Sequence, residues 1–183
     1  TMRLVEKAPS GALLLEPTVF GDERGYFFES FNARRWRELT GSADAFVQDN
    51  QSRAGRHVLR GLHYQISQVQ GKLVRCVEGV MFDVCVDIRR SSPTFGQWVG
   101  WELSAANHRM VWVPKGFAHG FLVLSEFAVC LYKTTDYWLP ESERSIAWND
   151  PALGITWPLR GSEPVLSGKD RAAVPLSQAE VFD

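Results

Sequence analysis

Two side chains suited to acid–base and anion-binding chemistry, Arg60 and His63, stand inside an otherwise apolar run from Val58 to Gln65. A cation buried in such a run destabilises the fold by on the order of several kcal/mol unless a partner compensates it. Because side chains alternate between the two faces of a strand, Arg60 and His63 would point in opposite directions. Gly61 lies between them and permits a bulge that brings both to one face. The run fits either a structural polar pair, which is the commoner arrangement, or a catalytic one.

The histidines give little support to a metal site. None of them forms an HxH or HxxxH pair; they are His57, His63, His108 and His119. Ligands from distant strands can still converge on a metal, so this spacing argues against a metal without excluding one. The chain also lacks GxGxxG, GxxxxGK[ST] and GxSxG motifs, so dinucleotide, P-loop and α/β-hydrolase chemistry are unsupported. The residues therefore give weak support to a metal and none to a dinucleotide cofactor.

Composition excludes several classes of partner. The 183 residues carry 20 Lys and Arg against 21 Asp and Glu, whereas a protein that coats nucleic acid needs a basic field. Cys76, Cys85 and Cys130 are too few and too widely spaced for a disulfide framework, so each is expected to pack as a small buried hydrophobe. No apolar run approaches the ~18 residues of a membrane span, and no signal-peptide pattern is present. We therefore expect a cytoplasmic protein with neither nucleic acid nor membrane as a partner.

Short apolar runs separated by turn residues recur along the chain, at the roughly 8–12-residue spacing typical of all-β proteins. In Val80–Ile88 the even-numbered residues are apolar and share one face, while Met81, Asp83, Cys85 and Asp87 share the other. Further strands are predicted over residues 72–78, 97–103, 110–113, 120–124 and 127–134. The pattern predicts a single all-β domain over residues 1–183, built as a sandwich, jelly roll or barrel.

Helices are expected to be few and short. Asn32 is a suitable N-cap and Gly41 a suitable stop for a helix over Asn32–Leu39, and a second helix is predicted in the tail after Pro175. Residues 160–174 are polar and lack apolar periodicity. This stretch is either a surface loop or a segment that folds back over a site.

Several long polar motifs, in their order along the chain, resemble those of one enzyme family, the dTDP-4-dehydrorhamnose 3,5-epimerases of dTDP-L-rhamnose biosynthesis. The motifs are Phe20–Glu29, Gln48–Asn50, Arg60–Gln65, Gln70–Arg75, Phe82–Arg89, Ser92–Gly96, Pro114–Phe121 and Leu131–Lys133. The resemblance extends from about Leu13 to about Pro175. It implies a cupin-like jelly-roll subunit in a homodimer, with a dTDP-sugar as substrate and no metal or nucleotide cofactor.

The same resemblance implies a catalytic set of four residues. His63 matches the family's base and Asp170 the carboxylate paired with it, which would give the tail after residue 160 a role in completing the site. Tyr132 matches the opposing acid, and Lys72 matches the cation beside the sugar ketone. Epimerisation needs these parts, because a C4 ketone acidifies the protons on C3 and C5, and the resulting enolate must be held and reprotonated on its other face.

Substrate-binding positions also carry over by resemblance. They are Arg24, Glu29, Gln48, Asn50, Arg60, His119, Glu143 and Lys169. The planar guanidinium of Arg60 suits a diphosphate. Trp138 stands where the family often has Tyr and offers a larger face for stacking on thymine. Asp83 is expected only to support residues that touch the substrate.

Three alternatives remain open at this point. A 3- or 5-mono-epimerase of a dTDP-4-keto deoxysugar pathway would use the same catalytic residues. A metal-dependent cupin enzyme would contain stoichiometric metal and lose activity to a chelator. A non-catalytic nucleotide-sugar binding module would lack one of the four catalytic residues, whereas all four are present.

Overall fold

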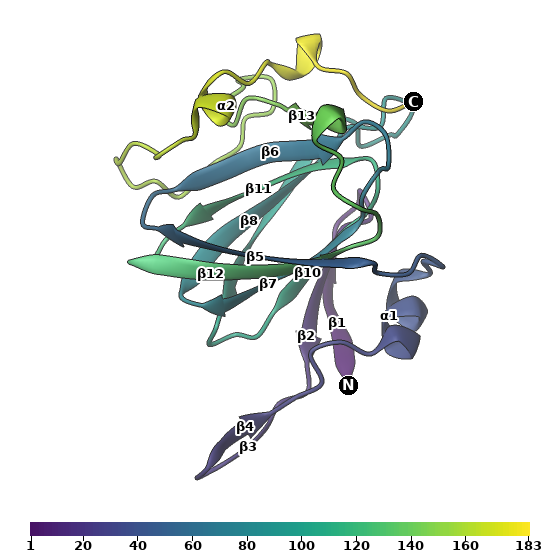
Figure 1. Cartoon of the computed structure of the whole chain (residues 1–183), viewed down its shortest axis with the longest axis vertical. Helices are drawn as coiled ribbons and strands as arrows, with labels where there is room; N and C mark the ends of the chain where they lie inside the picture. The colour runs from purple at the N-terminus through teal and green to yellow at the C-terminus, as the bar shows by residue number, and fades with distance from the viewer.

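In the computed structural model, which describes residues 1–183, two antiparallel sheets face each other and form a sandwich (Figure 1). The first sheet has the strand order β1 (Met2–Lys7), β2 (Leu13–Pro17), β10 (Met110–Val113), β7 (Lys72–Glu78), β12 (Phe127–Thr134) and β5 (Gln48–Gly55). The second has the order β13 (Glu143–Ser145), β6 (Leu59–Gln65), β11 (Phe117–Val123), β8 (Val80–Asp87) and β9 (Trp98–Ser104). The predicted all-β jelly-roll class is confirmed.

The remaining elements are short. A hairpin of β3 (Phe20–Asp22) and β4 (Gly25–Phe27) extends away from the sandwich (Figure 1). The α-helices are α1 (Ala33–Thr40) and α2 (Gly168–Arg171), and Pro140–Ser142 and Leu176–Gln178 form single 3₁₀ turns. No helix has the length and hydropathy needed to cross a bilayer.

Strand β8 shows how alternation builds the core. Met81 and Cys85 pack between the two sheets, in a cluster with Cys76 and Cys130, and all three cysteines are free and buried. Val84, Val86 and Ile88 face the other way, as predicted, and join a second cluster with Ile146, Leu153 and Trp157. The C-terminal part of the chain thus covers the outer face of the second sheet, and the last segment crosses near β6 (Figure 1).

Local signals placed one helix correctly and missed other elements. Asn32 Oδ1 accepts a hydrogen bond from Arg35 N at 3.1 Å, and Gly41 ends α1 with a φ of 70°, which confirms the predicted caps. The predicted tail helix is only the 3₁₀ turn at Leu176–Gln178, and α2 was not expected. Strand β5 also escaped prediction because its sequence is polar, and pairing with β12 defines it as a strand.

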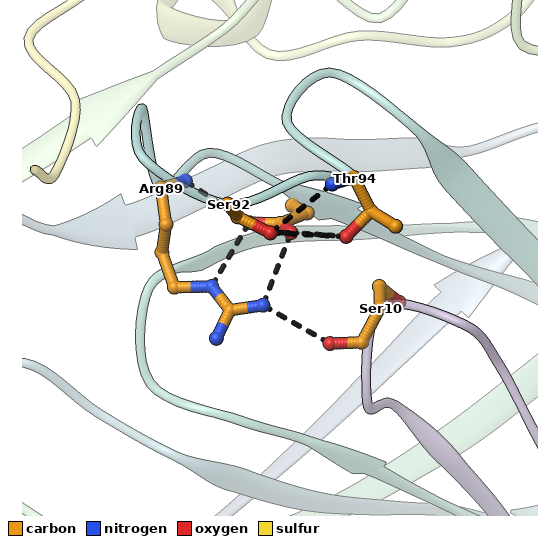
Figure 2. Close-up of polar contacts among 5 residues, drawn as sticks. Ser10, Arg89, Ser92 and Thr94 are labelled. Atoms are coloured by element: carbon orange, nitrogen blue, oxygen red, sulfur yellow. Dashed lines mark hydrogen bonds and ion pairs between the residues drawn. The ribbon is translucent and has the colours of Figure 1, made fainter.

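The loop between β8 and β9 is held by hydrogen bonds to the carboxylate of Asp87. Figure 2 shows the residues that donate them, Arg89, Ser92 and Thr94. Asp87 is fully buried, and its Oδ1 accepts from Arg89 N and Nε, both at 3.0 Å. Its Oδ2 accepts from Arg89 Nη2 at 3.0 Å and from the hydroxyls of Ser92 and Thr94 at 2.6 Å each. Arg89 Nη2 also donates to Ser10 O at 3.0 Å. Burial alone would raise the pKa of Asp87, but these donors lower it to about 2.

Candidate functional site

A cavity opens between the two sheets, and residues from both of them line its wall. The lining residues are Asn50, His63, Tyr64, Gln65, Gln70, Lys72, Tyr132, Trp138 and Glu143. Six of them were singled out from the sequence. The other three, Tyr64, Gln65 and Gln70, lie in the same motifs as His63 and Lys72, and this proximity is the signal that would have found them.

The bulge predicted at Gly61 sets the direction of His63. Across β6 and β11, His63 pairs with His119 and Arg60 pairs with Phe121, so β6 contains one extra residue between the two pairs. Gly61 has a φ of 136°, and a Cβ built on it would lie 2.6 Å from Gly120 Cα. Both the backbone conformation and this close approach require glycine. The extra residue brings Arg60 and His63 to the same face of β6.

The short helix α2 places a carboxylate behind His63. Asp170 is 3% exposed, and its Oδ1 lies 2.5 Å from His63 Nε2. Ser167 caps α2, with its Oγ accepting from Asp170 N at 3.1 Å, and Asp170 Oδ2 accepts from Gly61 N at 3.3 Å. An ionised carboxylate only accepts hydrogen bonds, so Nε2 carries the imidazole proton and Nδ1 is left with a free lone pair.

Electrostatics favour a neutral imidazole at His63. Burial lowers the pKa of His63, and the hydrogen bond to Asp170 opposes that effect in part. Lys72 and Lys169 lower it further. For Asp170, burial acts to raise the pKa, but hydrogen bonds led by that from His63 lower it overall. A neutral histidine paired with an ionised aspartate is a competent general base near neutral pH.

Tyr132 and Lys72 face His63 from the opposing sheet. Tyr132 lies on β12 and Lys72 on β7, and the Lys72 ammonium is 5.9 Å from the centre of the Tyr132 ring. Burial raises the pKa of Tyr132, with the Asn50 side chain opposing it, so the phenol keeps its proton. Burial lowers the pKa of Lys72, and Asp83 opposes this shift more than any other group. A base, a proton donor and a cation therefore surround one cavity.

Other predicted binding residues gather at the mouth of this cavity. Gln48 connects two of them, because its Nε2 donates to Asn50 Oδ1 at 3.0 Å and its Oε1 accepts from Trp138 N at 3.1 Å. Trp138 is 58% exposed, so its ring is free to stack on a planar ligand. Glu143 also lines the cavity, and its Oε2 forms an ion pair with Lys169 Nζ at 3.2 Å.

Gln65 and Gln70 hold the loop that carries Trp138. Gln65 Oε1 accepts from Leu139 N at 2.8 Å, and its Nε2 donates to Tyr137 O at 3.1 Å. Gln70 Nε2 donates to Asp136 O at 2.9 Å. These two amides fix the backbone on both sides of the tryptophan.

Arg24 and Glu29 do not join the cavity of their own chain. Arg24 is at the tip of the β3–β4 hairpin and pairs with Asp22, and the hairpin projects away from the sandwich (Figure 1). Glu29 faces the N-terminal amino group of Thr1 at 3.9 Å. Neither residue lines the cavity of its own chain.

Arg60 and His119, which the resemblance gave as substrate-binding residues, do not line this cavity. Arg60 was expected to be a buried cation, but it is exposed, so the energetic cost of burial does not arise. His119 is buried beside His63 and is not part of the cavity wall. Its Nε2 donates to Asp83 Oδ2 at 2.7 Å, which makes a second histidine–aspartate pair behind the first.

Comparison with known proteins gives consistent results. The profile of a family described as dTDP-4-dehydrorhamnose 3,5-epimerase matches residues 6–178. The chain is 59% identical to the dTDP-4-dehydrorhamnose 3,5-epimerase of Pseudomonas aeruginosa, over 99% of each chain. The structure is similar to the dTDP-6-deoxy-D-glucose-3,5-epimerase of Legionella pneumophila in complex with dTDP-4-keto-L-rhamnose, with 55% identity, a TM-score of 0.95 and coverage of 98% and 95%. A 3'-monoepimerase from Streptomyces bikiniensis in complex with dTDP-quinovose is 36% identical, with a TM-score of 0.86 and coverage of 92% and 85%.

Proposed function

Because this chain belongs to the dTDP-4-dehydrorhamnose 3,5-epimerase family, we propose that it is an isomerase that converts dTDP-4-dehydro-6-deoxy-D-glucose to dTDP-4-dehydro-L-rhamnose. The observation that carries the proposal is the His63–Asp170 pair, which faces Tyr132 and Lys72 across one cavity. This arrangement suits removal of a proton next to a ketone on one face of the sugar and its return on the other.

At each carbon, the reaction consists of two proton transfers. His63 Nδ1 takes the proton from C5 or C3, and the electron pair of the broken C–H bond moves into the enolate, with its charge on the C4 oxygen. Asp170 stabilises the imidazolium that forms, and Lys72 stabilises the enolate oxygen by its charge. The Tyr132 hydroxyl then donates its proton to the carbon from the opposite face. His63 afterwards loses its proton to solvent and Tyr132 regains one, so the new C–H bond carries a solvent-derived proton.

We extend the proposal to the substrate-binding residues. Asn50, Glu143 and Lys169 would hold the nucleotide sugar at the rim, Trp138 would stack on thymine, and Arg60 would meet the diphosphate. The exposed ring of Trp138 and the exposed guanidinium of Arg60 support these roles. The phosphate charges prevent such a substrate from crossing a bilayer unaided, which supports a cytoplasmic site of action.

We also infer that the protein acts as a homodimer in which the β3–β4 hairpin reaches the partner's cavity. Phe20, Tyr26 and Phe27 are 61%, 65% and 68% exposed, which is unusual for large aromatic side chains unless a partner covers them. Mixing Arg24→Ala subunits with His63→Ala subunits tests this arrangement. If Arg24 acts across the dimer, a hybrid contains one intact site and activity returns. If it acts within its own chain, the mixture stays inactive.

The decisive test of the function is NMR of the dTDP-4-keto sugar incubated with the protein in D₂O. Double epimerisation places deuterium at both C3 and C5. Label at only one carbon identifies a mono-epimerase, as in the relative from Streptomyces bikiniensis, and no label refutes the proposal. A parallel sample with EDTA examines the metal-dependent alternative, and we expect its labelling to be unchanged. His63→Ala should abolish the exchange while dTDP still binds.

A further inference from the structure

The carboxylate of Asp83 lies behind the cavity and is only half satisfied. It is fully buried on the inner face of β8. Its Oδ2 accepts the hydrogen bond from His119 Nε2, whereas its Oδ1 has no hydrogen-bond partner. Burying such an oxygen is costly, so a compensating positive charge is expected nearby.

The Lys72 ammonium is a buried positive charge that is itself unpaired. Lys72 is 9% exposed, and its ammonium makes no ion pair within the protein. Burial acts to remove its proton, which would leave a neutral amine that stabilises an enolate poorly. Val74 and Cys76 of β7 pack against Met81 and Cys85 of β8, and by alternation Lys72 and Asp83 point into the same space between the sheets. The charged form of Lys72 therefore depends on the titratable groups around it, which are Asp83 and Cys85 from β8, Cys130 and Tyr132 from β12, Glu143 from β13 and His63 from β6.

Most of these groups cannot supply negative charge to Lys72. Burial raises the pKa of Cys85, Cys130 and Tyr132, so all three are protonated near neutral pH. Glu143 lies at the cavity mouth and already pairs with Lys169. Asp83 is the carboxylate in this set that no other cation neutralises.

We propose that Asp83 is a positioning residue that keeps the Lys72 ammonium charged without binding it directly, and that His119 holds Asp83 in that place. The inference rests on the proposed function, because it explains how Lys72 is prepared to meet the enolate. A direct ion pair would engage at least one of the three ammonium donors. A carboxylate held back by His119 supplies the charge and leaves those donors free for the C4 oxygen.

Asp83→Asn tests the proposal through the pH dependence of kcat. Loss of the carboxylate lowers the pKa of Lys72, so the variant should lose activity at a lower pH than the wild type on the basic side. We expect that limb to move by at least one pH unit, with kcat at pH 8 reduced tenfold or more. Glu102→Gln is the matched control, because Glu102 is an exposed carboxylate on the neighbouring strand β9, and its profile should equal that of the wild type.

A direct titration makes the result independent of activity. In protein labelled at lysine ¹³Cε, Lys72→Arg identifies the Lys72 resonance by its loss, and the titration of that resonance is compared between wild type and Asp83→Asn. An unchanged pKa of Lys72 overturns the proposal. If Asp83→Asn does not fold, the same titration in His119→Gln and His119→Ala decides, since only the amide can still donate to Asp83. Equal titration of Lys72 in those two variants would refute the role of His119.

The two proposals fail separately. A wild type that incorporates no deuterium refutes the epimerase function. A wild type that turns over normally, with an Asp83→Asn variant of unchanged basic limb and unchanged Lys72 titration, refutes only the role of Asp83.

Discussion

Asp83 and Asp87 lie on the same face of the same strand, and both are fully buried, yet their surroundings differ. Asp87 accepts five hydrogen bonds, from Arg89, Ser92 and Thr94. Asp83 accepts one, from His119, and keeps an unpaired oxygen. Because donors occupy both of its oxygens, Asp87 stabilises the fold at the end of strand β8. Asp83 has only one hydrogen bond, so we infer that its charge acts on Lys72.

We expect the largest loss of kcat from substitution of a third buried carboxylate, Asp170. Asp170→Asn replaces an acceptor with an amide, which disrupts the tautomer of His63 and removes the charge that stabilises its imidazolium. We expect kcat to fall about 10²–10⁴-fold, more than for Asp83→Asn, because Asp170 touches the base directly. Deuterium exchange measures kcat, and urea denaturation verifies that the variant is folded. A loss smaller than that of Asp83→Asn would reverse the order of the two histidine–aspartate pairs.

The next effect separates stability from activity at Asp87. Asp87→Asn sets amide hydrogens against the donors of Arg89 and leaves the guanidinium without its charge partner. We expect the free energy of unfolding to fall by about 3 kcal/mol, with kcat per folded molecule unchanged. Urea denaturation and exchange kinetics on the same sample measure both quantities. A variant of normal stability and low kcat would show that Asp87 serves the site rather than the fold.

Stability in acid probes the same contrast without changing the donors. Asp87 has a pKa of about 2 when folded, against an ordinary 3.8. A depressed folded pKa contributes stability that is complete above the unfolded value and is lost as the pH falls from about 4 through about 2. The contribution is on the order of 2 kcal/mol. Unfolding free energies of the wild type should therefore decrease more steeply than those of Asp87→Asn across this range, and parallel curves would contradict the assignment.

The contrast on β8 also shows which features the sequence reveals. Alternation in Val80–Ile88 assigned both faces of the strand, and Gly61 indicated the bulge, because both signals are local. The donors around Asp87 are local too, since Arg89, Ser92 and Thr94 follow it closely. Asp83 has an equivalent place in the alternation, but its partner His119 is distant in the sequence, so nothing local identifies what binds it.

The rest of the site depends on contacts distant in sequence. His119 reaches Asp83 only because β11 pairs with β8, and Asp170 reaches His63 through a helix in a polar tail without periodicity. Strand β5 carries Gln48 and Asn50, but its sequence is polar, and only its pairing with β12 in the structure identifies it as a strand. The resemblance to known epimerases identified these residues as a set. Arg24 and Glu29 were identified in the same way, although neither lines the cavity of its own chain and the hairpin that carries Arg24 extends away from the sandwich (Figure 1).

The smallest expected effect measures how redundant the Asp87 cluster is. Ser92→Ala removes one of five donors, and Arg89 and Thr94 still bind both carboxylate oxygens (Figure 2). The loss of one hydrogen bond to a charged group should cost about 1–2 kcal/mol of unfolding free energy, with kcat and its pH dependence unchanged. Thr94→Ala is the matched variant and should behave alike, since its hydroxyl lies at the same 2.6 Å from Oδ2.

Asp83 has no such redundancy, because loss of the His119 donor leaves it without any hydrogen bond. If Ser92→Ala shifted the basic limb of kcat as Asp83→Asn is expected to do, the two carboxylates would be electrostatically coupled along β8, and the separation into a structural and a functional aspartate would fail.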